Sequence, residues 1–311
     1  MLSGVTEESR GAVIAAMGAN FAIAAGKLVA GVLTGSAAML AEAGHSVADT
    51  VNQVFLLVGI DLSDGEADET HPYGYGKEAF FWSFLAAIFI FVAGAAFSIF
   101  EGARTLLQED VHERSHRELI IAFGVLGMAF VFETASFAVA IRALFSSARK
   151  LGWSVFRYVR HSPDLTTKTV FYEDGAALTG LVLAAGGLAL SEITGSEVWD
   201  GIASLGIGIV LTIVALILGL QARRLLIGAS ASEETRARID ATLAEFPEFR
   251  RAVRILTMQI GPHSVLVSGE IEIAQTLSLP AAEDLLARID ARFAEVLPEV
   301  RETFWEIKGP A

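Results

Sequence analysis

Long apolar stretches occupy most of the first two thirds of the chain. A helix that crosses the hydrocarbon core of a bilayer needs about 20 mostly apolar residues. Stretches of that length, bounded by charged or turn residues, are Gly11–Leu33, Ala37–Ile60, Glu78–Leu107, Leu119–Phe145, Thr169–Leu190 and Gly201–Leu220. The mean hydropathy of +0.53 is also too high for the surface of a soluble domain. The sequence therefore predicts a multi-pass membrane protein with an all-α bundle of six transmembrane helices.

The remaining third has the pattern of a water-soluble fold. After Arg224, charged and apolar residues alternate, and the periodicity predicts a helix, two strands that turn at Gly261 and Pro262, a second helix and a third strand. This order favours a small two-layer α+β domain whose helices cover one face of a sheet. We therefore divide the chain into a transmembrane domain, residues 1–226, and a C-terminal domain, residues 227–311.

Charge and cysteine content restrict the topology and the ligands. Basic residues such as Lys77, Arg149 and Arg160 are concentrated in the loops on one side of the predicted bundle, which places both termini in the cytoplasm. The formal net charge of -13 argues against a nucleic-acid partner. Because the chain has no cysteine, any metal ion must be held by carboxylate, imidazole and amide groups.

Ionisable residues inside the second apolar stretch are the first candidates for a functional site. Glu42, His45 and Asp49 are spaced by three and four residues, so they share one face of a helix. An ionisable side chain at membrane depth costs at least ~2.5 kcal/mol, which makes it a functional candidate. An imidazole and a carboxylate one turn apart can bind the same ion. The alternatives are hydrogen bonds between helices for His45 and Asp49, and exposure to water for Glu42, which lies nearer the helix start.

Other apolar stretches supply groups that could complete such a site. Glu173 and Asp174 lie early in the fifth stretch, and Glu133 lies in the middle of the fourth. Oxygen ligands combined with imidazole nitrogen suit the tetrahedral preference of zinc, although manganese, cobalt or iron would also be accepted. In the first stretch, Asn20 suits interhelical hydrogen bonding better than metal ligation, and Lys27 would reach the interface or pair with a carboxylate.

Three motifs resemble the cation diffusion facilitator family of divalent-metal transporters, in particular its zinc-transporter-like branch. They are GSAAMLAEAGHSVAD at residues 35–49, HPYGYGK at 71–77 and DGIASLGIG at 200–208. The resemblance implies a homodimer with a ferredoxin-like cytoplasmic domain that exports metal from the cytoplasm by exchange for protons. It also implies a transporter rather than an enzyme, no prosthetic group, and the inner membrane as the location in a bacterium.

The resemblance also assigns ligands to the transport site. His45 and Asp49 match the family's ligand pair on the second helix, and Asp174 matches one of the pair on the fifth. The other position falls on Val170, which cannot bind metal, so the fourth ligand is Glu173, Glu133 or water. An accessory metal site at Asp68 and His71 is a weaker expectation, because Tyr75 stands where relatives have a second histidine.

Other functions stay open at this point. The chain could carry manganese, iron or cobalt, or it could be a membrane-anchored metal sensor or scaffold that binds ions without moving them. A passive cation channel is a further alternative, but a channel would need a more continuous polar lining than these few buried groups provide.

Overall fold

The computed structural model describes residues 7–107, 114–162 and 164–309. The chain forms two compact units that alternate along the sequence. As far as their residues are described, the first unit holds the chain up to Val58, Trp82–Tyr158 and Thr166–Leu220, and the second holds Gly59–Phe81, Val159–Leu165 and the chain from Gln221 onward.

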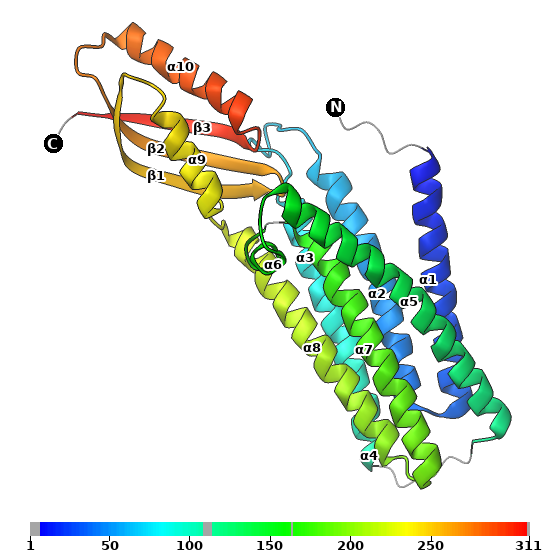
Figure 1. The fold of residues 1–311 in the computed structure, drawn as a ribbon. Coiled ribbons are helices and arrows are strands. Elements are labelled where there is room, and N and C mark those ends of the chain that lie inside the picture. The colour runs from blue at the N-terminus through cyan, green and yellow to red at the C-terminus, as the bar shows by residue number, and fades with distance from the viewer. Residues whose placement is uncertain (1–6, 108–113, 163, 310–311) are drawn as a thin grey trace. The chain divides into compact units, whose positions relative to one another are not determined.

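The first unit is built from long helices that lie side by side (Figure 1). The helices that enter it are α1 (Glu7–Thr34), α2 (Ala37–Ser63), α3 (Glu78–Phe89), α4 (Phe97–Leu107), α5 (His116–Lys150), α6 (Val155–His161), α7 (Leu165–Thr194) and α8 (Val198–Ile227). Each predicted apolar stretch lies within one of these helices or, for Glu78–Leu107, within α3, α4 and the π-helical segment η1 (Ile90–Ala96) between them. The helices extend past the predicted ends because helical hydrogen bonding continues into the polar flanks.

Four helical spans of the described residues are long and apolar enough to cross a membrane. They are Glu78–Leu107, His116–Lys150, Leu165–Thr194 and Val198–Ile227. The apolar part of α1, Asn20–Thr34, is shorter, and α2 carries polar residues along one face. The structure therefore shows a helical bundle with four spans able to cross a membrane among the described residues, while the number of six spans stays a prediction.

Close backbone contacts and exposed apolar side chains both fit a lipid environment. A Cβ on Gly102 of α4 would come within 2.8 Å of the carbonyl oxygen of Gly201 on α8, so these helices approach closely only because Gly102 has no side chain. On the outer faces, Val131 and Val139 of α5 and Val182 of α7 are 67%, 63% and 61% exposed. Lipid tails cover such surfaces without the cost that water would impose.

The C-terminal part of the second unit is a three-stranded sheet with two helices. The elements are α9 (Glu233–Leu243), β1 (Phe249–Gly261), β2 (Ser264–Ile273), α10 (Leu279–Val296) and β3 (Val300–Lys308), which is the predicted order. β2 is central, antiparallel to β1 and parallel to β3. β1 begins as early as Phe249 because this residue pairs with Ile273, a long-range contact that local periodicity does not reveal.

A separate apolar core holds this sheet and its helices together. Ile239 and Leu243 of α9, Val267 of β2 and Ile289 and Phe293 of α10 are all buried. Beside this core, the indole of Trp305 on β3 lies over Gly269 of β2, where a Cβ would overlap the ring. The indole N–H donates to Asp290 of α10 at 2.9 Å, which fixes α10 against β3.

Candidate functional site

One face of α2 carries the polar residues expected at the site. Glu42, His45 and Asn52 are 0%, 2% and 0% exposed, and Asp49 is half-buried. Another side of α2 packs closely, since a Cβ on Gly44 would lie 2.7 Å from the Phe97 ring. The helix is thereby held with its polar face turned into the bundle.

His45 has a free nitrogen inside the bundle. Its Nδ1 is buried and has no hydrogen-bond partner among the described residues. A buried polar atom without a partner is rare and calls for a functional or structural explanation. An imidazole nitrogen that no protein group occupies is available to a cation.

The two neighbouring carboxylates of α7 are held by different helices. Asn52 of α2 donates to Oε2 of Glu173 at 2.7 Å, and Oε1 of Glu173 is buried without a partner in the described part of the chain. Ser136 of α5 donates to Oδ2 of Asp174 at 2.8 Å.

The predicted ligands therefore come from α2 and α7 and lie in the same interior region. They are not assembled around one point, however. Over the described residues, no group of three or more His, Asp or Glu side chains is arranged to hold a metal ion. Hydrogen bonds from Asn52 and Ser136 hold the two α7 carboxylates instead.

The other candidate residues, Glu133, Asn20 and Glu42, lie in different surroundings. Glu133 is half-buried on α5. Asn20 is half-buried on α1. Glu42 is fully buried and forms an ion pair with Lys27 of α1, with Nζ 2.9 Å from Oε2. The interpretation that Glu42 faces water is therefore wrong, and Lys27 pairs with a carboxylate instead of reaching the interface.

Asp68 and His71, the predicted accessory pair, organise a turn in the second unit. Oδ1 of Asp68 accepts from the backbone N–H of His71 at 2.7 Å and from Thr70, and Oδ2 accepts from the Tyr75 hydroxyl at 2.8 Å. These bonds, led by the Thr70 hydroxyl, hold the pKa of Asp68 below its usual value. Nδ1 of His71 lies 2.9 Å from the Thr70 hydroxyl. Protein groups thus already engage both oxygens of the Asp68 carboxylate and Nδ1 of His71.

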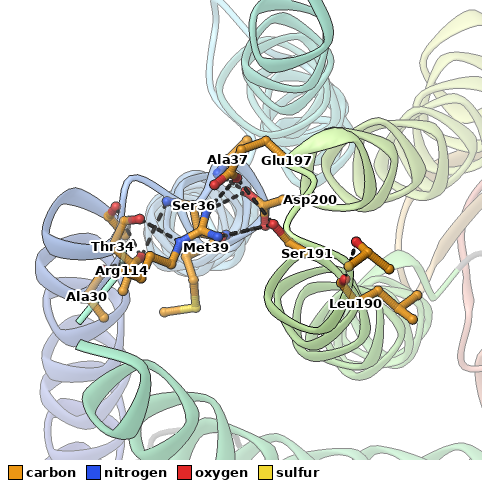
Figure 2. Close-up of polar contacts among 12 residues, drawn as sticks. Ala30, Thr34, Ser36, Ala37, Met39, Arg114, Leu190, Ser191, Glu197 and Asp200 are labelled. Atoms are coloured by element: carbon orange, nitrogen blue, oxygen red, sulfur yellow. Dashed lines mark hydrogen bonds and ion pairs between the residues drawn. The ribbon is translucent and has the colours of Figure 1, made fainter. Parts of the chain in front are cut away.

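Sequence reasoning missed a polar cluster at one end of the bundle, which we call the Asp200 cluster (Figure 2). Asp200 of α8 is fully buried and accepts from the Ser36 hydroxyl at 2.7 Å and from the backbone N–H of Ala37 at 2.6 Å. Arg114 pairs with Glu197 at 2.6 Å and lies 3.8 Å from Asp200. Ser36 and Asp200 both lie in the family motifs, but the sequence does not show that they meet.

Arg114 extends this cluster to further segments. Its Nε donates to the carbonyl oxygen of Thr34 at 2.8 Å, and its Nη1 donates to Ser191 at 3.2 Å. The start of α2, the segment before α5 and the turn between α7 and α8 are therefore tied together at this end of the bundle. These contacts indicate a structural role, in which the cluster holds the helix ends together.

Comparison with known proteins identifies the family. The model of the cation efflux transmembrane domain matches residues 13–227. The chain belongs to the cation diffusion facilitator family. The match also supports the observed helices as those of an integral membrane protein.

The family's curated members include several that resemble this chain. The mitochondrial proton-coupled zinc antiporter SLC30A9 of Xenopus laevis is 35% identical over 79% of this chain and 43% of its own length. Metal tolerance protein C4 of Arabidopsis thaliana is 32% identical over 86% of this chain and 57% of its own length. Magnetosome protein MamM of Paramagnetospirillum magneticum is 25% identical over 83% of this chain and 76% of its own length. The chain thus spans about half the length of the first two relatives.

Proposed function

We propose that this protein transports divalent metal ions, with zinc as the principal substrate, in exchange for protons. The observation that carries the proposal is the buried Nδ1 of His45, which has no hydrogen-bond partner among the described residues and lies on the same helical face as Asp49. Membership in the cation diffusion facilitator family and the names of the zinc antiporter relatives support the choice of substrate. Manganese, iron and cobalt are the alternative substrates, because the same ligand types accept them.

We assign His45, Asp49 and Asp174 as ligands of the transported ion, and Glu173, Glu133 or water as the fourth. Since no three of these side chains are arranged around one point in the described residues, binding would require the side chains of α2 and α7 to turn toward one ion. The hydrogen bonds from Asn52 and Ser136 would then be exchanged for bonds to the metal. Exchange of this kind allows the carboxylates to be satisfied both with and without the ion.

The ligand types support coupling to protons. Carboxyl and imidazole groups both exchange protons. A divalent cation that binds to His45, Asp49 and the α7 carboxylates would displace the protons that they carry, since metal ligands must be deprotonated. Protons supplied from the other side of the membrane would expel the metal in turn, which is antiport.

The topology and assembly of the chain are part of the same proposal. We infer six transmembrane helices, cytoplasmic termini, export of metal from the cytoplasm and, in a bacterium, insertion into the inner membrane. The C-terminal sheet with α9 and α10 would form a ferredoxin-like domain that mediates homodimerisation. From residue 230 onward only His263 offers a nitrogen ligand and no thiol is present, so this domain is expected to bind metal poorly.

Flux in proteoliposomes tests the proposed function. Zinc uptake should depend on an imposed pH gradient and should be lost in His45→Ala, because the imidazole ligand is removed. His263→Ala is the matched control, since this exposed histidine lies in the turn between β1 and β2. Binding without flux would show a sensor or scaffold, and flux that ignores the pH gradient would show a passive channel.

A further inference from the structure

Lys27 is a fully buried lysine within the apolar part of α1. It is 0% exposed, and its ammonium donates to Oε2 of Glu42 at 2.9 Å and to the hydroxyl of Ser46 at 2.8 Å. A charged side chain in this setting is expensive, and it persists only when it is paired or has a function. Both of its partners are on α2 and flank His45.

The other oxygen of Glu42 points to α7. A Cβ at Gly180 would overlap Oε1 of Glu42, and this oxygen has no hydrogen-bond partner among the described residues. The carboxylate therefore lies between the Lys27 ammonium and the backbone of α7. The missing side chain at Gly180 is what allows a carboxylate to be held there.

Glu42 lies one helical turn from His45 on the polar face of α2, and Gly180 lies two turns from Glu173 on α7. A cation bound by His45, Asp49 and the α7 carboxylates would therefore be within electrostatic reach of Glu42. With Lys27 in place, the charge of Glu42 is compensated. Without Lys27, Glu42 would add an uncompensated oxygen ligand of the kind that manganese prefers more than zinc does.

We propose that Lys27 is a built-in counter-charge that keeps Glu42 out of the metal's ligand set and thereby sets the affinity and the metal preference of the transport site. This inference rests on the proposed function, because it concerns the same site. In this inference, Lys27 is a positioning residue that acts through Glu42 and does not contact the metal.

The test compares Lys27→Met, Glu42→Gln and the double variant in the full-length protein, with zinc and manganese binding measured by calorimetry in detergent. Lys27→Met should raise zinc affinity on the order of tenfold, and manganese affinity by more, because Glu42 becomes an uncompensated anion. Glu42→Gln should lower zinc affinity on the order of tenfold, because the Lys27 charge is then unopposed. The double variant should lie between the two single variants.

Opposite signs distinguish an electrostatic role from a structural one. A purely structural ion pair would lower the thermal stability of both single variants and leave metal affinity unchanged, or lower it in both, and either result would overturn the inference. If Lys27→Met does not fold, the zinc affinities of Glu42→Gln and of the double variant are compared instead. The inference requires the double variant to bind zinc more tightly, because it lacks the Lys27 charge. Ser46→Ala, which removes one hydrogen bond and no charge, is the control and should change affinity little.

A different result would reject the proposed function itself. If the parent protein neither binds nor transports zinc, manganese, iron or cobalt, the site is not a metal site. If the parent binds zinc and the variants show no opposing shifts, only the role of Lys27 is rejected.

Discussion

Asn52 of α2 donates a 2.7 Å hydrogen bond to Oε2 of Glu173 on α7. The adjacent Asp174 is instead held by Ser136 of α5, at 2.8 Å. Residues next to each other on a helix point about 100° apart, so the two carboxylates cannot easily face one ion together. The structure shows that residues of different helices, α2 and α5, hold them.

We predict that Asp174 is the dominant α7 ligand. Asp174→Ala should reduce zinc affinity by about 100-fold, which corresponds to about 2.7 kcal/mol, because a carboxylate ligand is lost. Glu173→Gln should retain binding and change the pH dependence of transport, because the amide no longer exchanges a proton. Zinc titration of both variants checks this, and affinity lost only in Glu173→Gln would reverse the assignment.

The Asp200 cluster should stabilise the bundle. Asp200→Ala leaves the Ser36 hydroxyl and the Ala37 N–H without their acceptor and, among the described residues, leaves Arg114 with Glu197 alone as an ionic partner. The free energy of unfolding should fall by about 1–3 kcal/mol, the cost of unsatisfied buried groups. Thermal unfolding in detergent measures this loss.

Two arginines of the same segment provide an internal comparison. Arg114→Gln should destabilise the protein, since this buried side chain reaches Thr34, Ser191 and Glu197. Arg117→Gln, at an exposed position three residues later, should have little effect. Equal melting temperatures for the two variants would contradict the role assigned to the cluster.

Two glycines of α7 should respond in opposite ways to alanine. Gly180→Ala places a methyl group where Oε1 of Glu42 lies, so the ion pair with Lys27 must shift, at a cost of about 1–3 kcal/mol. Gly186 has nothing within 4 Å of an added Cβ, so Gly186→Ala should be neutral or stabilise the helix by up to about 1 kcal/mol. Chemical or thermal unfolding of the two variants provides the measurement, and a Gly180→Ala protein as stable as the parent would show that Glu42 is free to move.

Asp68 should control the order of the loop that it bonds. Asp68→Ala removes the acceptor for Thr70, His71 and Tyr75, so amide hydrogen exchange in residues 64–77 should become faster, whereas Glu66→Ala, an exposed neighbour, should not change it. The pKa of Asp68 is lower in the folded protein than its unfolded value of ~3.9. The contribution of its hydrogen bonds to the order of the loop is therefore fully present above the unfolded pKa, and it is lost only as the pH falls through the folded pKa. Protection should therefore be constant from about pH 5 to 8. Zinc-dependent protection that disappears in His71→Ala would instead support the accessory metal site.

Much of the architecture is determined by the sequence alone. The length of an apolar stretch indicates whether a helix can cross a bilayer, and hydrophobic periods of 3.6 and 2 residues distinguish helices from strands. The helices and the αββαβ order of the C-terminal elements therefore follow from local patterns. The spacing of Glu42, His45 and Asp49 likewise determines that they share one face of α2. The motifs around these residues and around Asp200 are sufficient to identify the family.

Only the tertiary structure decided how the polar groups are paired. Lys27 and Glu42 are 15 residues apart, Asn52 and Glu173 are 121 apart, and Ser36 and Asp200 are 164 apart, and no local pattern encodes which of these groups meet. Periodicity shows which residues share one face of a helix. It does not determine how that helix is rotated about its axis, or shifted along it, relative to its neighbours. That rotation and shift are set by close packing at positions such as Gly44, Gly102 and Gly180, where a missing side chain lets one helix, or one carboxylate, approach another.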